Sequence, residues 1–579
     1  MIKAEMDSFE VPLYFSRSRL STSSNRTGNW SFIQPAYRDR TAPCSERCPC
    51  GTDIPRVESL AAEGKHGAAW ATILMENPLP GVCGRVCYHP CEQACNRGEF
   101  DTPVAVHALE RFLADQAQRA RVPQDLKPKA ANGKRAAVLG SGPAGLSAAS
   151  FLARLGYACD VYETEAEPGG VLRWGIPAYR LPGAILAQEI EAIQALGVTL
   201  HCGAAMDESL AGSYDALLVA CGHGQPQGLG VPGAELARDG LALLHAARSQ
   251  GGGNGAAPGA RVAVIGGGNT AIDVARTLLR QGLRPIIVYR RRREDMPAFA
   301  PELERALSEG AQLMELHAPV ALAREAEGLR LTLQKMRSLD PGPDGRNPVA
   351  PLPDPPSTLL VAEVYSAVGA EPAPAWMQLM ERTPRLRLAR CSLAFRPTPV
   401  AFIGDLETET KSVSEAIASG KEAALALDTC FREGADAVVE RLAACRIGAG
   451  SALSMELYLG GARARRSPRV VRFPELNRAY FQLSDRARPR ALPALASIGS
   501  FAEVESGLKA AEAGLEAERC FSCGTCNGCD NCRTFCPDCA VLMEGGSRRI
   551  ATEYCKGCGV CVEECPRSAM AMTMEDGRS

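Results

Sequence analysis

The sequence predicts an α/β protein that contains two glycine-rich strand–loop–helix units. Two apolar runs, at residues 136–139 and 261–265, are expected to be buried strands that end in glycines, and each glycine loop opens a helix. Strand-like runs that end at Gly222, Gly369 and Gly404 extend this pattern of parallel strands. The 579 residues are enough for roughly four domains.

Cysteine is the unusual part of the composition. Of 24 cysteines, 7 lie between Cys44 and Cys95 and 11 between Cys520 and Cys565. Residues 1–10 lack the basic and apolar parts of a secretory signal, and no run of 18 apolar residues spans a membrane. We therefore expect a cytoplasmic protein whose cysteines bind metal rather than form disulfides. The net charge of −2 is spread along the chain and favours neither nucleic acid nor a membrane surface as partner.

The first glycine loop has the pattern of a dinucleotide site. Its glycines allow a tight turn and a close approach of the backbone to a pyrophosphate, and the helix N-terminus supplies N–H groups. The following strand ends in an acid, which can bind ribose hydroxyl groups. The alternative is a glycine turn in an unrelated α/β unit. The residues of this predicted site are Gly140, Gly142, Pro143, Ala144, Gly145 and Glu163.

The second loop differs at the end of its second strand. It runs from Gly266 through Gly268 to Ala271, and the next strand is followed by four arginines, residues 290–293, in place of an acid. A guanidinium pairs with a 2′-phosphate that a carboxylate would repel, so NADP is favoured over NAD. The alternative is that these arginines form a solvated surface run.

Together the two sites predict FAD in the first loop and a nicotinamide nucleotide in the second, placed for hydride transfer at FAD N5. This step needs no acid–base side chain, so no catalytic residue is expected. Residues 96–519 contain no cysteine pair with redox-disulfide spacing, and their six single cysteines are expected in the core. Electrons must therefore leave the flavin by another route.

A doubled cysteine motif near the C-terminus indicates that route. Two C-x2-C-x2-C-x3-C-P runs have the spacing of a bacterial ferredoxin with two 4Fe–4S clusters, in which the fourth cysteine of each run binds the other cluster. Zinc-ribbon spacing is the alternative. The expected ligand sets are Cys526, Cys529, Cys532 with Cys565, and Cys555, Cys558, Cys561 with Cys536.

The N-terminal cysteine segment, PCSERCPCGTDIP with GVCGRVCYHPCEQACNR, resembles the cluster domain of the glutamate synthase small-subunit family. That domain is shared with the N-terminal region of dihydropyrimidine dehydrogenase. GGVLRWGIPAYRLP, GGGNTAIDVARTLLR and VYRRRREDMP continue the resemblance over about residues 41–430. It implies FAD in a domain made of two segments, NADP(H) in an inserted domain and two N-terminal 4Fe–4S clusters.

The resemblance assigns one N-terminal cluster to Cys48, Cys87, Cys91 and Glu110. The family takes two ligands of the other cluster from an RCxxC segment that precedes these cysteines, but residues 30–43 contain none. An RCxxC signature occurs instead at Cys520 and Cys523. Our hypothesis is that these two fold back to complete a cluster with Cys44 and Cys95; the alternative is an incomplete or absent cluster. Three cysteines near the motifs receive no role: Cys50, Cys83 and Cys539.

The resemblance also implies nucleotide contacts. Gly170, Val171 and Arg180 should lie on the flavin. The ribityl-phosphate side of the flavin should be bound by Gly404, Asp405, Ser412 and Val413. The strand end that should lie close to both nucleotides consists of Ala367, Val368 and Gly369. The residues that should contact NADP are Asn269, Thr270, Ala271, Arg290 and Arg291.

The expected domain order follows from these motifs. It is an extended arm (1–40), a helical domain with two 4Fe–4S clusters (41–125), the first segment of the FAD domain (126–255), an NAD(P) domain (256–365), the second segment of the FAD domain (366–435), an irregular linker (436–515) and a two-cluster ferredoxin domain (516–579).

We expect an NAD(P)H-dependent oxidoreductase subunit that exchanges electrons with a redox partner enzyme or ferredoxin within a larger complex. Family members with an attached ferredoxin resemble subunits that serve glutamate synthase, dissimilatory sulfite reductase or 2-oxoacid oxidoreductases. The alternatives are a cluster-bearing assembly subunit without turnover and a glutamate synthase small subunit.

Overall fold

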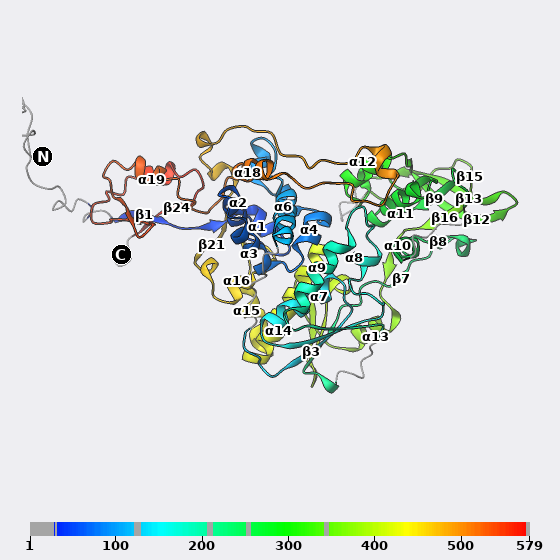
Figure 1. Cartoon of the computed structure of the whole chain (residues 1–579), viewed down its shortest axis with the longest axis horizontal. Helices are drawn as coiled ribbons and strands as arrows, with labels where there is room; N and C mark the ends of the chain where they lie inside the picture. Colours follow the sequence, from blue (N-terminus) through cyan, green and yellow to red (C-terminus); the bar gives the residue numbers. More distant parts are fainter. Residues whose placement is uncertain are drawn as a thin grey trace, which may run out of the picture.

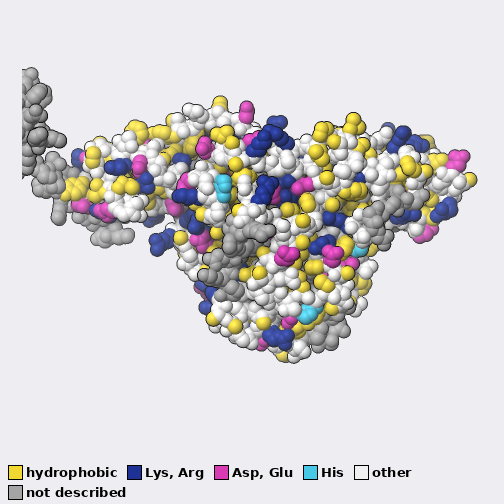
Figure 2. Space-filling view, in the orientation of Figure 1, with side chains coloured by type: hydrophobic (Ala, Val, Ile, Leu, Met, Phe, Trp, Pro, Cys, Tyr) yellow, Lys and Arg dark blue, Asp and Glu magenta, His cyan; other side chains and the backbone are white. Residues whose placement is uncertain are grey.

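The structure is a computed structural model that describes residue 28 and residues 32–120, 129–204, 212–249, 256–340 and 347–574. Most of the expected N-terminal arm therefore lies outside the described residues. Figure 1 shows the C-terminal cysteine-rich domain at one end of the long axis, the NAD(P)-type domain at the other, and the FAD-type domain below the middle. On the face in Figure 2, basic and acidic side chains are interspersed.

Short helices separated by cysteine loops form the N-terminal domain. Proline begins three of them, where its missing N–H removes no helical hydrogen bond. The longest, α6, buries Leu109, Phe112 and Leu113 on one face. The helices are α1 (Pro43–Arg47), α2 (Ile54–Ala62), α3 (His66–Glu76), α4 (Pro80–Val86), α5 (Pro90–Gln93) and α6 (Val106–Arg119).

The FAD-type domain is built on a seven-stranded sheet in the order β18-β19-β20-β6-β3-β4-β5. The central strands are parallel, and β20 comes from the part of the sequence that follows the inserted domain. Helix α14 packs so closely on α7 that a Cβ at Gly420 would meet the Ala144 carbonyl at 2.2 Å. The strands are β3 (Arg135–Leu139), β4 (Ala158–Glu163), β5 (Thr199–Cys202), β6 (Ala216–Val219), β18 (Leu386–Arg387), β19 (Ser392–Ala394) and β20 (Val400–Phe402); the helices are α7 (Pro143–Arg154), α8 (Val171–Trp174), α9 (Gly183–Gln194), α13 (Pro374–Arg382) and α14 (Val413–Glu433).

The inserted domain has a five-stranded parallel sheet in the order β11-β10-β9-β16-β8. An antiparallel sheet of β12 to β15 packs against it through a shared apolar core. Two crossings of the chain connect this domain to the FAD-type domain. They contain the strands β7 and β17, which pair with each other. The elements are β7 (Gln225–Pro226), β8 (Arg238–Asp239), α10 (Gly240–Ser249), β9 (Arg261–Ile265), α11 (Asn269–Arg280), β10 (Arg284–Tyr289), α12 (Ala300–Ser308), β11 (Gln312–Glu315), β12 (His317–Glu325), β13 (Gly328–Ser338), β14 (Val349–Pro351), β15 (Ser357–Val361), β16 (Glu363–Ser366) and β17 (Ala370–Glu371).

The segment expected to be an irregular linker wraps around the other domains. It passes through α15 (Val438–Ala443) and α16 (Met455–Tyr458), and β21 (Ser467–Val470) pairs in parallel with β2 (Arg40–Thr41). It then reaches the inserted domain at α17 (Ala494–Ile498) and returns to the N-terminal helices at α18 (Ala510–Glu518) (Figure 1).

The ferredoxin-type domain uses a strand from the other end of the chain. Strand β1 (Ile33–Tyr37), in the expected arm, pairs antiparallel with β24 (Met570–Met574). The remaining elements are α19 (Asn531–Thr534), β22 (Val541–Glu544), β23 (Ser547–Ile550) and α20 (Val560–Glu563). Among the described residues, no helix has the length and apolar character to cross a membrane. The predicted α/β fold class with two Rossmann-like domains and two flanking cysteine-rich domains is confirmed.

Candidate cofactor sites and redox centres

The first glycine loop forms a cradle at the N-terminus of α7. Gly140 has a φ of +101°, and a Cβ there would meet the Ala220 carbonyl oxygen at 2.6 Å. A Cβ on Gly145 would meet the Gly140 oxygen at 2.0 Å, so only glycine allows this packing of strand and helix. Around Gly142, in contrast, there is open space, as a pyrophosphate on the helix N-terminus requires.

Glu163 lies at the end of β4, as predicted, and is 7% exposed. Its carboxylate accepts hydrogen bonds from the backbone N–H of Ser141, at 3.0 Å, and from that of Glu165, also at 3.0 Å. The Glu163 carboxylate therefore holds the backbone of the glycine loop in position. The hydroxyl groups of Ser141 and Thr164 also donate to it, so a ribose hydroxyl group would have to replace one of these donors.

Segments from both halves of the FAD-type domain meet at this loop. A Cβ on Gly170, whose φ is +51°, would lie 2.9 Å from the Gly142 Cα, and Val171 beside it is 47% exposed. A Cβ on Gly404 would lie 2.9 Å from the Ala144 Cβ. Next to it, burial raises the pKa of Asp405, and Ser412 and Val413 begin α14.

Arg180 differs from its neighbours in the predicted flavin set. Its guanidinium forms an ion pair with Asp273 of the inserted domain, at 2.7 Å, and its side chain is 9% exposed. The structure therefore places Arg180 at the contact between the two nucleotide domains.

The second glycine loop repeats this construction at α11. Gly266 has a φ of +142°, and a Cβ there would meet the Ala367 oxygen at 2.3 Å, whereas Gly268 faces open space. Thr270 and Ala271 lie in the first turn of α11, and the Asn269 side chain accepts a hydrogen bond from the backbone N–H of Phe299 at 2.9 Å. The neighbouring strand end carries Val368, 40% exposed, and Gly369, with a φ of +130°.

The four arginines after β10 have different surroundings. Arg291 donates its Nε–H to the Asn347 carbonyl at 3.1 Å. Arg292 pairs with Glu294, at 3.4 Å, and Arg293 pairs with Glu304. Arg290 is exposed, and within the described ranges its guanidinium has no carboxylate partner. Arg290 is thus available to an anionic ligand.

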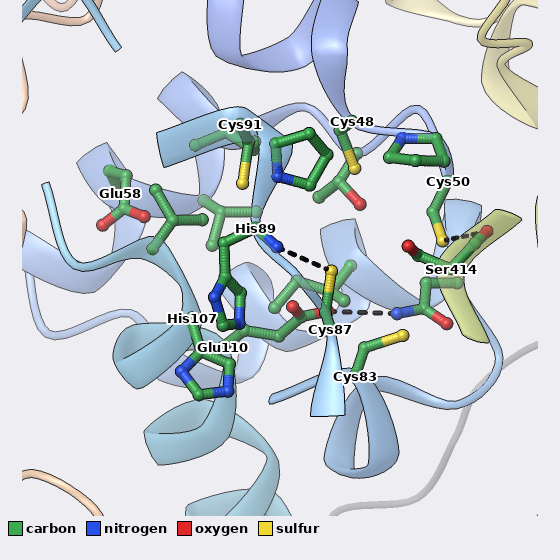
Figure 3. A pocket seen from close by; sticks show the side chains of 18 residues that line it. Cys48, Cys50, Glu58, Cys83, Cys87, His89, Cys91, His107, Glu110 and Ser414 are labelled. Carbon is green, nitrogen blue, oxygen red and sulfur yellow. Dashed lines mark hydrogen bonds between the residues drawn. The ribbon is translucent and has the colours of Figure 1, made fainter. Parts of the chain in front are cut away.

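Cys48, Cys87, Cys91 and Glu110 line one cavity of the N-terminal domain (Figure 3). Burial and the nearby Cys48 raise the pKa of Glu110 to about 8, and burial raises that of Cys87 to about 12. Such groups are uncharged unless a cation stabilises their charged forms. The donor set thus fits a cationic iron–sulfur core.

Sequence reasoning missed several residues of this cavity. Asn77 donates a hydrogen bond to Glu110 at 3.0 Å, which holds its carboxyl group in place. Ser414, from the first turn of α14, lines the cavity beside the flavin segment. Cys50 and Cys83 also line it. Ser414 is revealed only by the tertiary contact between α14 and the N-terminal helices, and the others only by the packing of those helices.

The structure brings Cys44, Cys95, Cys520 and Cys523 together in the same apolar core. Burial raises the pKa of Cys44, and the thiols of the other three, close to it, add to this effect. Asn96 lies next to the group and donates to the Cys523 sulfur at 3.4 Å. The buried Arg519 holds the segment in place through Asp101, at 3.0 Å. This is the arrangement that the fold-back hypothesis requires.

The eight cysteines of the ferredoxin motif surround two cavities in the expected crossed pairing. The first is lined by Cys526, Cys529, Cys532 and Cys565, and the second by Cys536, Cys555, Cys558 and Cys561. The arm contributes a neighbour to each: the Tyr37 hydroxyl lies 3.1 Å from the Cys532 sulfur, and Pro35 lines the second cavity. Cys539 is exposed and lines neither cavity.

Three family models match the chain. Residues 37–122 match the 4Fe–4S domain II of dihydropyrimidine dehydrogenase, residues 134–316 match pyridine nucleotide-disulphide oxidoreductases, and residues 549–571 match the 4Fe–4S binding domain. These matches confirm the predicted classes of the N-terminal, nucleotide-binding and C-terminal regions.

Three relatives extend the match. The beta subunit of NADP(+)-dependent formate dehydrogenase from Moorella thermoacetica is 33% identical over 528 residues, which cover 83% of this chain and 70% of that protein. The beta subunit of NADPH-Fe(3+) oxidoreductase from Geobacter sulfurreducens is 33% identical, with 57% of this chain and 51% of that protein covered. Subunit PreT of NAD-dependent dihydropyrimidine dehydrogenase from Salmonella typhimurium is 35% identical, with 51% and 72% covered. The chain therefore belongs to the family of pyridine nucleotide-dependent oxidoreductase subunits that combine a Rossmann-type nucleotide-binding core with 4Fe–4S domains.

Proposed function

We propose that the protein is an NAD(P)H-dependent oxidoreductase subunit that binds FAD and four 4Fe–4S clusters and exchanges electrons with a partner redox protein. When bound, FAD converts a transferred hydride into single electrons, which 4Fe–4S clusters carry. The observation that supports this most directly is the row of four cysteine groups that leads from the FAD-type domain to the ferredoxin-type domain.

Each group in this row adjoins the next. Ser414, two residues beyond the predicted flavin contact Ser412, lines the Cys48 cavity. Burial and the thiols of Cys48 and Cys87 raise the pKa of Cys91 in that cavity, and the Cys44 thiol of the next group adds to this effect. The charge of Arg567 acts to lower the pKa of Cys523, and Arg567 also lines the Cys526 cavity. This succession of neighbouring groups suits single-electron transfer along one line.

We propose that NADP(H) is favoured over NAD(H). The guanidinium of Arg290 is exposed, has no carboxylate partner among the described residues and lies at the strand end where an acid would select NAD, which supports this preference. The relatives' names include both nucleotides. We further propose a cytoplasmic location, because closely spaced thiolate ligands persist in reducing compartments, and a partner enzyme in a larger complex, because the relatives are named as subunits.

Anaerobic stopped-flow spectroscopy of the FAD- and iron-loaded protein tests the function. NADPH should bleach the flavin absorbance and then reduce an artificial one-electron acceptor in steady state. An absence of flavin reduction in fully loaded protein would contradict the enzyme proposal and favour the assembly role.

The coenzyme preference has a matched pair of variants. Arg290→Glu should raise the KM for NADPH about 10- to 100-fold, the loss of one charged hydrogen bond, and leave that for NADH nearly unchanged. Arg292→Glu is the control, because Arg292 already pairs with Glu294. Equal effects of both variants on both nucleotides would argue against a 2′-phosphate contact.

A further inference from the structure

Residues 488–506 form a hairpin-like strap that extends from the N-terminal helices to the inserted domain (Figure 1). Its two arms are hydrogen-bonded to each other: the Leu492 N–H donates to the Val504 carbonyl at 2.8 Å, and the Ser506 N–H to the Arg490 carbonyl at 2.8 Å. Helix α17 forms its tip. The strap is thus a defined element rather than a loose connection.

The tip of the strap is anchored in a buried charge cluster of the inserted domain. The Ser497 side chain is enclosed, donates to Glu309 at 2.5 Å and accepts from Arg280 at 2.6 Å. Glu309 also accepts from Arg276 at 2.7 Å. A neutral hydroxyl group from the strap therefore completes the hydrogen bonding of a carboxylate shared by two helical arginines.

The base of the strap joins the inserted domain to the N-terminal domain. The Glu505 carboxylate accepts from Arg305 of α12 at 2.6 Å, and its backbone carbonyl accepts from Arg111 of α6 at 2.6 Å. Glu503, two residues earlier, pairs with Arg85 at 2.8 Å and with Arg111 at 2.9 Å. One short segment thus bonds to two bodies at once.

The strap also contacts the FAD-type domain. The Val504 N–H donates to the Tyr179 carbonyl at 3.0 Å. The Tyr179 hydroxyl group donates to the Asp273 carbonyl of α11 at 3.1 Å, and the Arg280 guanidinium lies 3.8 Å from the centre of the Tyr179 ring. The ion pair between Arg180 and Asp273 belongs to the same contact. All three bodies therefore meet at the strap.

We propose that the strap fixes the orientation of the inserted domain against the FAD-type domain, with Ser497 and Glu505 as positioning residues for the hydride exchange. This inference rests on the proposed function. The two crossings between the nucleotide domains pair over only two residues each, and Arg180 and Arg248 add direct polar contacts between these domains. Hydride transfer requires the reacting atoms within about 3–3.5 Å of each other, so small rotations of one domain against the other matter. The strap limits such rotations by bonding both domains to a third body, the N-terminal helices.

Charge reversal across the strap tests the proposal in the loaded protein. Glu505→Arg and Arg305→Glu should each lower the limiting rate of flavin reduction at saturating NADPH by about tenfold or more. The Kd for NADPH should stay unchanged, because neither residue lines the glycine loop. The double variant, which restores the opposite charges, should recover most of the rate. Ser497→Ala should give a smaller loss of the same kind.

Matched controls are Glu518→Arg, an exposed glutamate on α18, and Ser308→Ala, an exposed serine on α12. Flavin content and iron content should match the wild type in every variant. If Glu505→Arg does not fold, Glu505→Gln replaces it in the same measurement.

Hydrogen–deuterium exchange provides a readout that does not depend on activity. Exchange at residues 177–182 and in β7 and β17 should be faster in Glu505→Arg than in Glu518→Arg. Unchanged exchange, or wild-type limiting rates in both single variants, would overturn the positioning role and leave the proposed function intact. If wild-type protein is not reduced by NADPH at all, the proposed function fails, and the exchange experiment still decides whether the strap fixes the domains.

Discussion

The two pairs of cysteine groups differ in how the chain builds them. The ferredoxin-type pair uses eight cysteines within one short stretch, and three of them, Cys526, Cys529 and Cys558, are exposed. None of the seven cysteines assigned to the N-terminal pair is exposed; they are Cys44, Cys48, Cys87, Cys91, Cys95, Cys520 and Cys523. One of the two groups joins residues from both ends of the chain, because Asn96 and Cys523 are 427 positions apart. The cysteines of the first pair are close together in the sequence, although the arm strand β1 packs beside them, whereas those of the second pair come from distant segments.

This difference predicts different consequences of metal loss. A cluster that closes short loops contributes mainly to its own small domain. When a cluster is buried in an apolar core that several segments share, its binding free energy is coupled to the folding of all those segments. In this chain the N-terminal helices, α18 and the flanking segments share that core.

The largest effect is expected for Cys520→Ser. It should remove about four irons per chain and lower the thermal midpoint by about 5 °C or more, because the fold-back segment loses its metal anchor. Iron analysis and calorimetry of anaerobically purified protein measure both. Cys539→Ser, an exposed cysteine outside both ferredoxin cavities, is the control. Unchanged iron in Cys520→Ser would contradict the fold-back cluster.

Cys555→Ser tests the other half of the comparison. It should also remove about four irons, but the main unfolding transition should stay within about 2 °C of the wild type, because only the terminal domain loses a ligand. A drop as large as that of Cys520→Ser would show that the two pairs stabilise the protein equally.

Ion pairs near the two pairs of groups should differ in the same way. Glu76 and Lys421, which join α3 to α14 at 2.7 Å, are 2% and 1% exposed. Glu76→Gln leaves a buried, unpaired ammonium group and should cost about 3–5 kcal/mol of unfolding free energy. Glu544→Gln, which breaks an exposed pair with Arg549 on the ferredoxin hairpin, should have no measurable effect. Urea unfolding compares the two variants.

The buried pair also predicts a pH dependence. Burial acts to raise the pKa of Glu76, but the charges of Lys421 and Arg463 outweigh it and hold the pKa below the ordinary value of 4.5. A lowered pKa stabilises the folded protein above pH 4.5, and this contribution disappears as the pH falls through the lowered value. Wild-type stability should therefore fall more steeply than that of Glu76→Gln in this acid range, and parallel curves would contradict the assignment.

The smallest effect is expected for Glu110→Gln. The amide keeps an oxygen ligand, so the iron content should not change, but the loss of one negative charge should raise the reduction potential of one cluster by about 60 mV, a tenfold change in a one-electron couple. A redox titration followed by electron paramagnetic resonance measures the shift. Glu99→Gln, a glutamate in the same domain that does not line the cavity, is the control. An unchanged set of potentials would argue against Glu110 as a ligand.

Sequence reasoning succeeded where the signal was local. The glycine loops at Gly140 and Gly266 need glycine for steric reasons that their spacing already displays. The crossed pairing of the ferredoxin cysteines follows from the doubled motif. Cys520 and Cys523 could be linked to Cys44 only because a short signature was displaced along the chain; no periodicity brings them together.

The wrapping segment could not be predicted because its buried apolar side chains, such as Val438, Met455 and Val471, lie scattered among polar anchors. Arg463 donates to the Gly51 carbonyl at 2.7 Å, and Arg466 pairs with Asp53 at 2.7 Å. Such contacts leave no hydrophobic pattern in the sequence. The same reason explains why neither the strap nor the ion pair between Arg180 and Asp273 was foreseen.

The meeting of Cys44 and Cys95 with Cys523 also sets an order of events during synthesis. A ribosome that adds about 5–20 residues per second needs about 20–85 s to pass from Asn96 to Cys523. Throughout that interval the N-terminal thiols are made but lack two of their partners. For the cluster proposed at these four thiols, this means that iron can complete the centre only after translation has reached Cys523.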